Sequence, residues 1–163
     1  MTQQATQTGT LTLRLGDEGN TRALGRALAP LLGAGDVVAL EGGLGAGKTT
    51  LARAILETLG AKGPIASPTF TLVQTWALAV PVWHFDLYRL KNARELAELG
   101  LEEALDTAIT LIEWPGIARD LLPPSTLFVV LAGEGDARHA IITGPQRFIE
   151  KLGVLAGRGA HAS

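Results

Sequence analysis

The sequence has 163 residues, a length that suits one domain with a sizeable core. Apolar residues make up 47% and charged residues 18%, a balance that excludes a disordered chain. The net charge of −2 excludes the strongly basic footprint of a protein that holds nucleic acid by itself.

Features that the sequence lacks exclude several classes of protein. The chain has no cysteine, which excludes disulfides and cysteine-ligated zinc. No stretch reaches the roughly 18 apolar residues of a membrane span. The first ten residues are polar and lack the basic and apolar regions of a secretory signal. We therefore expect a cytoplasmic protein.

Taken in chain order, the elements predict one domain over residues 11–156, between a disordered tail at 1–10 and a loose tail at 157–163. Alternating or continuous apolar runs predict strands, and apolar residues at helical spacing predict helices. The predicted strands are 11–15, 36–40, 70–76, 80–86, 108–113, 127–131 and 140–143. The predicted helices are 17–32, 49–59, 92–100 (capped by Asn92), 101–105, 114–121 and 146–155.

The run Gly42–Thr49 fits G-x-x-x-x-G-K-T, a loop that wraps phosphates with its backbone N–H groups. Its glycines permit the backbone angles and close approach that this wrapping needs. Lys48 suits the β- and γ-phosphates, and the Thr49 hydroxyl suits Mg²⁺. The predicted nucleotide-binding residues of the loop are Gly43, Leu44, Gly45, Ala46, Gly47, Lys48, Thr49 and Thr50.

A strand directly before this loop and a helix directly after it indicate an α/β fold. We predict a P-loop NTPase three-layer α/β/α sandwich with a mixed central sheet, in which hairpins flank a parallel centre.

Two acidic residues close apolar runs and are candidates to complete the site. Asp86 ends the run 82–86, and Glu113 ends the run 109–113. Ligands in open α/β sheets bind at the carboxyl ends of strands. Hydrolysis needs one carboxylate for the metal and a group that orients water. The residues alone leave open which acid orients the water.

Three further positions have roles that the sequence suggests less directly. A hydroxyl in Ser67-Pro68-Thr69 either senses the γ-phosphate or caps a local turn. His84 is expected to be a strand residue and not a catalyst. Trp114 either belongs to the core or covers the site.

Missing motifs bear on the activity. The chain lacks an N/T-K-x-D guanine motif and an LSGGQ-like signature, which favours ATP over GTP and argues against a transporter ATPase. A small-molecule kinase remains an alternative, although no arginine-rich lid is evident. A binding module that uses ATP without hydrolysis is a third possibility.

Four motifs in register resemble the TsaE (YjeE) family, the small ATPase of bacterial tRNA threonylcarbamoyladenosine biosynthesis. They are GGLGAGKTT at 42–50, SPTFTL at 67–72, HFDLYRL at 84–90 and EWP at 113–115, and the similarity covers about residues 11–147. The resemblance implies a cytoplasmic ATPase that uses ATP and Mg²⁺ with the partners TsaD and TsaB. Hydrolysis, slow alone, would reset that complex between rounds, and tRNA would be contacted only indirectly.

The resemblance also implies residue roles. It makes Lys48 the phosphate lysine, Thr49 and Glu113 the metal ligands, Asp86 the acid that assists hydrolysis, and Thr69 a switch-like position.

Glu18 and Arg138 align with nucleotide-contacting positions of the family. The chain departs from the family at Gly43, where an aspartate is usual, so a carboxylate that touches a partner or positions water is missing.

Overall fold

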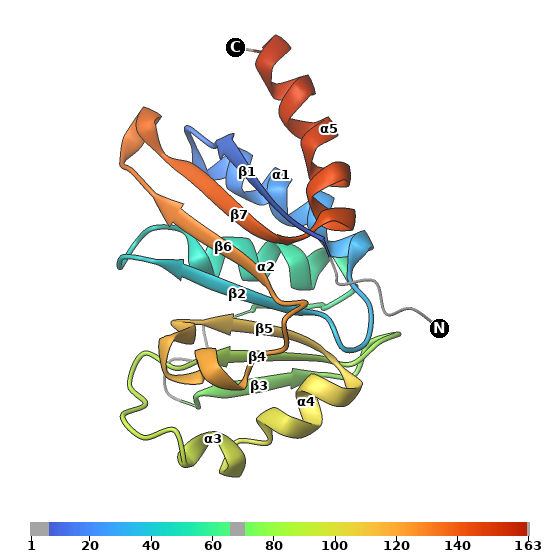
Figure 1. Ribbon diagram of the computed structural model, residues 1–163, viewed down its shortest axis with the longest axis vertical. Coiled ribbons are helices and arrows are strands. Elements are labelled where there is room, and N and C mark those ends of the chain that lie inside the picture. Colours follow the sequence, from blue (N-terminus) through green and yellow to red (C-terminus); the bar gives the residue numbers. More distant parts are fainter. Residues whose placement is uncertain (1–6, 66–70, 163) are drawn as a thin grey trace.

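A computed structural model describes residues 7–65 and 71–162, with side chains described as far as residue 154. Seven strands form one mixed sheet in the order β1-β7-β6-β2-β5-β4-β3, which helices flank (Figure 1). The strands are β1 (Thr8–Arg14), β2 (Val37–Gly42), β3 (Val73–Trp76), β4 (Val82–Asp86), β5 (Ile109–Glu113), β6 (Leu127–Ala132) and β7 (His139–Pro145). The α-helices are α1 (Glu18–Leu28), α2 (Lys48–Thr58), α3 (Glu95–Glu98), α4 (Leu101–Thr107) and α5 (Gln146–Ala162). The 3₁₀ helices are η1 (Ala29–Leu31), η2 (Pro115–Leu121) and η3 (Gly135–Ala137).

The centre of the sheet is parallel and its edges are antiparallel. β2 pairs in parallel with β5 and β6, and β4 pairs in parallel with β5. β5 is buried along its whole length, as its mostly apolar sequence predicts for a strand covered on both faces. The hairpins β3–β4 and β6–β7 are antiparallel, which confirms both hairpins predicted from the sequence.

Helices cover both faces of the sheet. Successive residues of β2 point to opposite faces, so Val38 and Leu40 join one core cluster while Val37 joins the other. The first cluster packs under α1, α2 and α5, and the second packs under α3, α4 and η2. This arrangement confirms the predicted three-layer α/β/α sandwich.

The phosphate-loop helix α2 lies tightly against α1. A Cβ placed at Gly25 of α1 would stand 2.6 Å from the Cβ of Ala54 and 3.1 Å from the carbonyl oxygen of Leu51. At α1's start, Asp17 accepts a hydrogen bond of 2.8 Å from the backbone N–H of Asn20. The first feature holds α1 against the middle of α2, and the second caps the first turn of α1.

Several elements begin or end at other residues than the sequence predicts. β1 begins at Thr8, three residues early, because pairing with β7 orders a Thr/Gly stretch that has no apolar signal. Residues 71 and 72 form a turn before β3. The single turn α3 begins at Glu95, since Asn92 accepts from the N–H of Arg94 in a local turn and does not cap a helix.

The last helix is longer than predicted. α5 continues to Ala162, although residues 157–163 were expected to be a loose tail. Isolated glycines cost a helix about 1 kcal/mol each and do not by themselves end it. None of the helices in the described ranges combines the length and apolar character that crossing a membrane requires.

The α1–α2 contact yields a stability prediction. Gly25→Ala is expected to lower the free energy of unfolding by about 1–3 kcal/mol, because overpacking outweighs alanine's helix propensity. Urea unfolding measures this change. The matched control is Gly153→Ala in α5, where an added Cβ meets no atom within 4 Å and stability is expected to rise by up to about 1 kcal/mol. A rise in the free energy of unfolding of both variants would contradict the close contact between α1 and α2.

Candidate functional site

The phosphate loop connects the end of β2 to the first residue of α2. Gly42 and Gly47 have φ of +148° and +109°, in the region that favours glycine. A Cβ at Gly42 would also lie 2.7 Å from the carbonyl oxygen of Leu131 on β6. The loop therefore needs glycine at both positions, and it leads straight into the N-terminus of α2, where unpaired N–H groups suit an anion.

Lys48 is the first residue of α2, and its side chain is 5% exposed. Its Nζ donates to the carbonyl oxygens of Gly42 at 2.6 Å and Gly43 at 2.8 Å. The ammonium also lies 4.0 Å from the ring centroid of Trp114, within cation–π range. Burial lowers the pKa of Lys48, while the nearby Glu113 and Asp86 act in the opposite direction.

The two predicted carboxylates end neighbouring strands and lie opposite each other in register. Asp86 of β4 pairs with Glu113 of β5, and both are buried. The Thr49 hydroxyl donates to Glu113 Oε1 at 2.8 Å, so the carboxylate reaches the phosphate-loop helix. Asp86 accepts from the N–H of Tyr88 at 3.1 Å. The structure thus brings Lys48, Thr49, Asp86 and Glu113 together at one edge of the sheet.

The pair formed by Thr49 and Glu113 fits a magnesium ion. A hydroxyl and a carboxylate are hard oxygen ligands, which Mg²⁺ prefers. Within residues 7–65 and 71–162, no group of three or more His, Asp or Glu residues is placed to hold a metal.

His84 is a strand residue, as expected, but it also contacts an acid of the site, which the sequence did not predict. It is 1% exposed, and its Nε2 lies 2.7 Å from Glu113 Oε2. Its spacing of two from Asp86 carried the signal, because residues i and i+2 of a strand share a face. The expectation of an ordinary strand residue overlooked this alternation and the acid on the adjacent strand.

Trp114 covers the site and does not belong to the core. Its φ of +56° is a left-handed conformation that non-glycine residues seldom adopt, which turns the chain sharply after β5. Its ring centroid lies 4.8 Å from that of Tyr88, and Tyr88 is 52% exposed. Both rings border an open hollow of about 360 Å³. The hollow is lined by Glu41, Gly42, Leu87, Tyr88, Leu90, Trp114, Pro115, Gly116 and Ile117.

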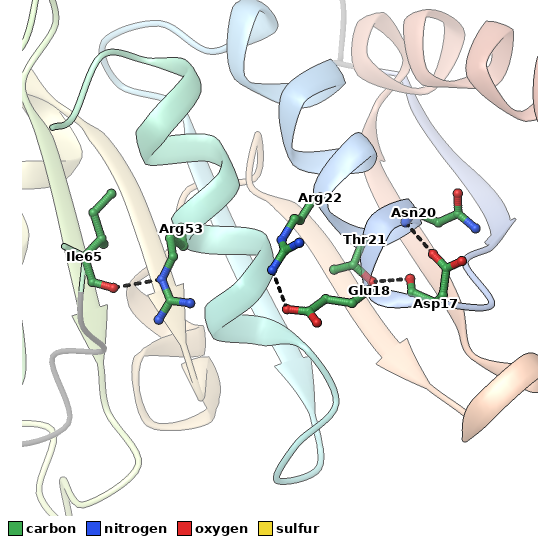
Figure 2. Close-up of polar contacts among 7 residues, drawn as sticks. All are labelled: Asp17, Glu18, Asn20, Thr21, Arg22, Arg53 and Ile65. Carbon is green, nitrogen blue, oxygen red and sulfur yellow. Dashed lines mark hydrogen bonds and ion pairs between the residues drawn. The ribbon is translucent and has the colours of Figure 1, made fainter. Parts of the chain in front are cut away.

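The first turn of α1 lies on another side of the phosphate loop. A Cβ at Gly47 would stand 3.6 Å from Thr21 Cγ2. Glu18 is exposed and forms a 2.8 Å ion pair with Arg22 (Figure 2). The carbonyl oxygen of Arg138 accepts from the N–H groups of Leu15 and Gly16, which places Arg138 beside the entry to α1.

The predicted positions Glu18 and Arg138 therefore approach the same region, although they are 120 residues apart in sequence. The Nε of Arg138 is buried and has no hydrogen-bond partner among the residues that the structure describes.

The predicted switch position Thr69 lies outside the described residues, as do Ser67 and Pro68. The chain that leads toward them is held on α2, where Arg53 Nε donates to the carbonyl oxygen of Ile65 at 2.8 Å (Figure 2).

The chain is similar to known proteins in sequence and in fold. A family model described as "Threonylcarbamoyl adenosine biosynthesis protein TsaE" matches residues 15–141. The tRNA threonylcarbamoyladenosine biosynthesis protein TsaE of Rickettsia felis is 45% identical over 121 residues, which are 73% of this chain and 71% of the relative. The protein of that name from Bacillus subtilis is 37% identical over 123 residues, 74% of this chain and 77% of the relative. The crystal structure of Bacillus subtilis YdiB matches with a TM-score of 0.72 at 27% identity, over 95% of this chain and 99% of YdiB.

The lowered pKa of Lys48 yields a prediction about stability and pH. Between that pKa and the ordinary value of 10.5, the unfolded chain binds more protons at this residue than the folded protein does. The free energy of unfolding of the wild type is therefore expected to rise with pH relative to Lys48→Met across this window. Urea titrations of both proteins without nucleotide measure the difference, and a difference that falls as the pH rises would contradict the prediction.

Proposed function

This chain belongs to the TsaE family of threonylcarbamoyl adenosine biosynthesis proteins, and on that premise we propose that it is a Mg²⁺-dependent ATPase. In this proposal it binds and hydrolyses ATP as a subunit of the machinery that makes N6-threonylcarbamoyladenosine next to the tRNA anticodon. Hydrolysis resets an assembly of TsaD and TsaB. The convergence of Lys48, Thr49, Asp86 and Glu113 at one edge of the sheet carries the proposal.

The phosphates bind to the loop and to the start of α2. Backbone N–H groups from Gly43 to Thr50 surround them, and the Lys48 ammonium exchanges its carbonyl partners and the Trp114 ring for phosphate oxygens. The low exposure of Lys48 strengthens its attraction to anions, because little water screens the charge. Glu18 and Arg138 contact the nucleotide from the side where α1 begins.

Thr49 and Glu113 hold Mg²⁺. The ion, when bound, neutralises charge on the β- and γ-phosphates. Glu113 suits this role better than Asp86 does, because its Oε1 already accepts from the Thr49 hydroxyl.

Asp86 orients the attacking water. Both oxygens of Glu113 accept hydrogen bonds, from Thr49 and from His84, and this fixes Glu113 as a ligand. Asp86, opposite Glu113 and close enough to influence Lys48, is the remaining buried acid at this edge among the described residues. Thr69 responds to the γ-phosphate from the segment that follows Ile65.

Gly43 changes how the chain depends on its partners. A Cβ at this position would meet no atom of the described residues within 4 Å, and the φ of Gly43 is not in the left-handed region, so nothing in that part of the chain requires glycine there. A carboxylate at this place would sit at the exposed rim of the phosphate loop. We infer that its absence makes hydrolysis depend more strongly on groups that TsaD and TsaB supply.

The proposal predicts slow hydrolysis by the isolated chain and faster hydrolysis with TsaD and TsaB, because partners complete and close an open site. ADP formation measures both rates, with Lys48→Ala plus the same partners as the control. Full turnover by the isolated chain without any effect of partners would contradict the prediction. Transfer of phosphate to an acceptor alcohol instead of water would favour a small-molecule kinase.

The different roles proposed for Asp86 and Glu113 lead to a second prediction. Asp86→Asn is expected to lower kcat about 100- to 10,000-fold, as loss of a group that accepts a proton or orients water does. Its affinity for MgADP should stay within about two-fold of the wild type, because Asp86 is not assigned to the metal or phosphates. Calorimetry and ADP release separate the two quantities. A variant that loses Mg²⁺-dependent binding while turnover survives would reverse the roles of Asp86 and Glu113.

A further inference from the structure

The buried contact between His84 and Glu113 goes beyond the phosphate loop and its two acids. His84 lies on β4 and Glu113 at the end of β5, and the side chains are 1% and 2% exposed. The 2.7 Å separation of Nε2 and Oε2 is a short hydrogen bond. Because a carboxylate oxygen accepts, Nε2 of His84 carries the donated hydrogen.

This contact divides the two oxygens of Glu113 between two donors. Oε1 accepts from Thr49 and Oε2 accepts from His84, so the plane of the carboxylate is fixed. The Lys48 ammonium is also near enough to interact with Glu113. Without a donor at Oε2, the carboxylate is freer to turn toward Lys48. Such a rotation would occupy the phosphate lysine and withdraw Glu113 from Thr49.

Placing a histidine here has a cost for folding. Its second ring nitrogen, Nδ1, is buried and has no hydrogen-bond partner within residues 7–65 and 71–162. An apolar side chain would avoid that unsatisfied atom and pack in the same sheet core. Local features that cost stability without a packing gain concentrate at functional sites.

We propose that His84 is a positioning residue that holds Glu113 toward Thr49 for the metal. The inference rests on the proposed binding of Mg-ATP and deepens it. His84 touches neither phosphates nor metal, and its effect passes through Glu113. Loss of its donor should therefore weaken the binding of Mg²⁺ and leave metal-free nucleotide binding nearly unchanged.

Two substitutions of similar size and polarity test the contact. The side-chain nitrogen of His84→Gln is as many bonds from Cβ as Nε2, so it can still donate to Glu113. The nitrogen of His84→Asn corresponds to Nδ1 and falls short. The matched control is Thr110→Val on β5, which removes a buried hydroxyl that also has no hydrogen-bond partner in the described part of the chain.

Calorimetry with a non-hydrolysable ATP analogue, in EDTA and over a range of Mg²⁺, is the measurement. We expect His84→Asn to need about 10- to 100-fold more Mg²⁺ than the wild type, as loss of a group that orients a metal ligand does. His84→Gln should recover most of this loss, and Thr110→Val should match the wild type. All variants should bind the analogue with similar affinity in EDTA.

Equal weakening of His84→Asn with and without Mg²⁺, or no change in its Mg²⁺ requirement, would overturn the inference. A wild type that binds the analogue independently of Mg²⁺, or not at all, would overturn the proposed function itself. Nitrogen NMR of the wild-type imidazole needs no variant. The hydrogen is expected on Nε2 and its signal should move when Mg²⁺ joins the bound analogue, whereas a hydrogen on Nδ1 alone would refute the contact.

Discussion

A buried ammonium is the interaction on which the rest of the site depends. Lys48 has lost most of its water, and burial disfavours its charge. Two loop carbonyls, the face of Trp114 and the carboxylates of Glu113 and Asp86 offset that loss. These partners come from three places in the fold: the phosphate loop after β2, the end of β4 and the end of β5. The loop, the sheet order and the sharp turn at Trp114 must all be in place for the charge to be tolerated.

The parallel centre of the sheet supplies that arrangement. β5 lies between β2 and β4, so the phosphate loop after β2 and the acids that end β4 and β5 share one edge. Register then decides the pairing, because Asp86 stands opposite Glu113 and His84 lies two residues earlier on the same face. A shift of β4 by one residue would turn His84 and Asp86 away from the face on which Glu113 lies.

Charge and hydrogen bonding give the two acids different environments. Glu113 accepts from a hydroxyl and an imidazole, and both of its oxygens are committed before any ligand arrives. Asp86 accepts from the backbone of the turn that follows its own strand. Two acids at adjacent strand ends thus have different surroundings. Glu113 is held rigidly beside α2, whereas Asp86 is bound to the turn that follows β4.

Local patterns in the sequence determined the phosphate loop, the strand before it, the helix after it and the acids at two strand ends. These features depend on glycine content, apolar runs and residues adjacent in the chain, which a sequence displays directly. Tertiary structure alone decided that Asp86 faces Glu113, that His84 contacts Glu113 and that Trp114 lies over Lys48. It also ordered Thr8–Thr10, where pairing with β7 replaces a missing apolar signal. The physical reason is that hydrogen bonds and charge pairs between distant segments depend on strand order and register, which no short stretch of sequence specifies.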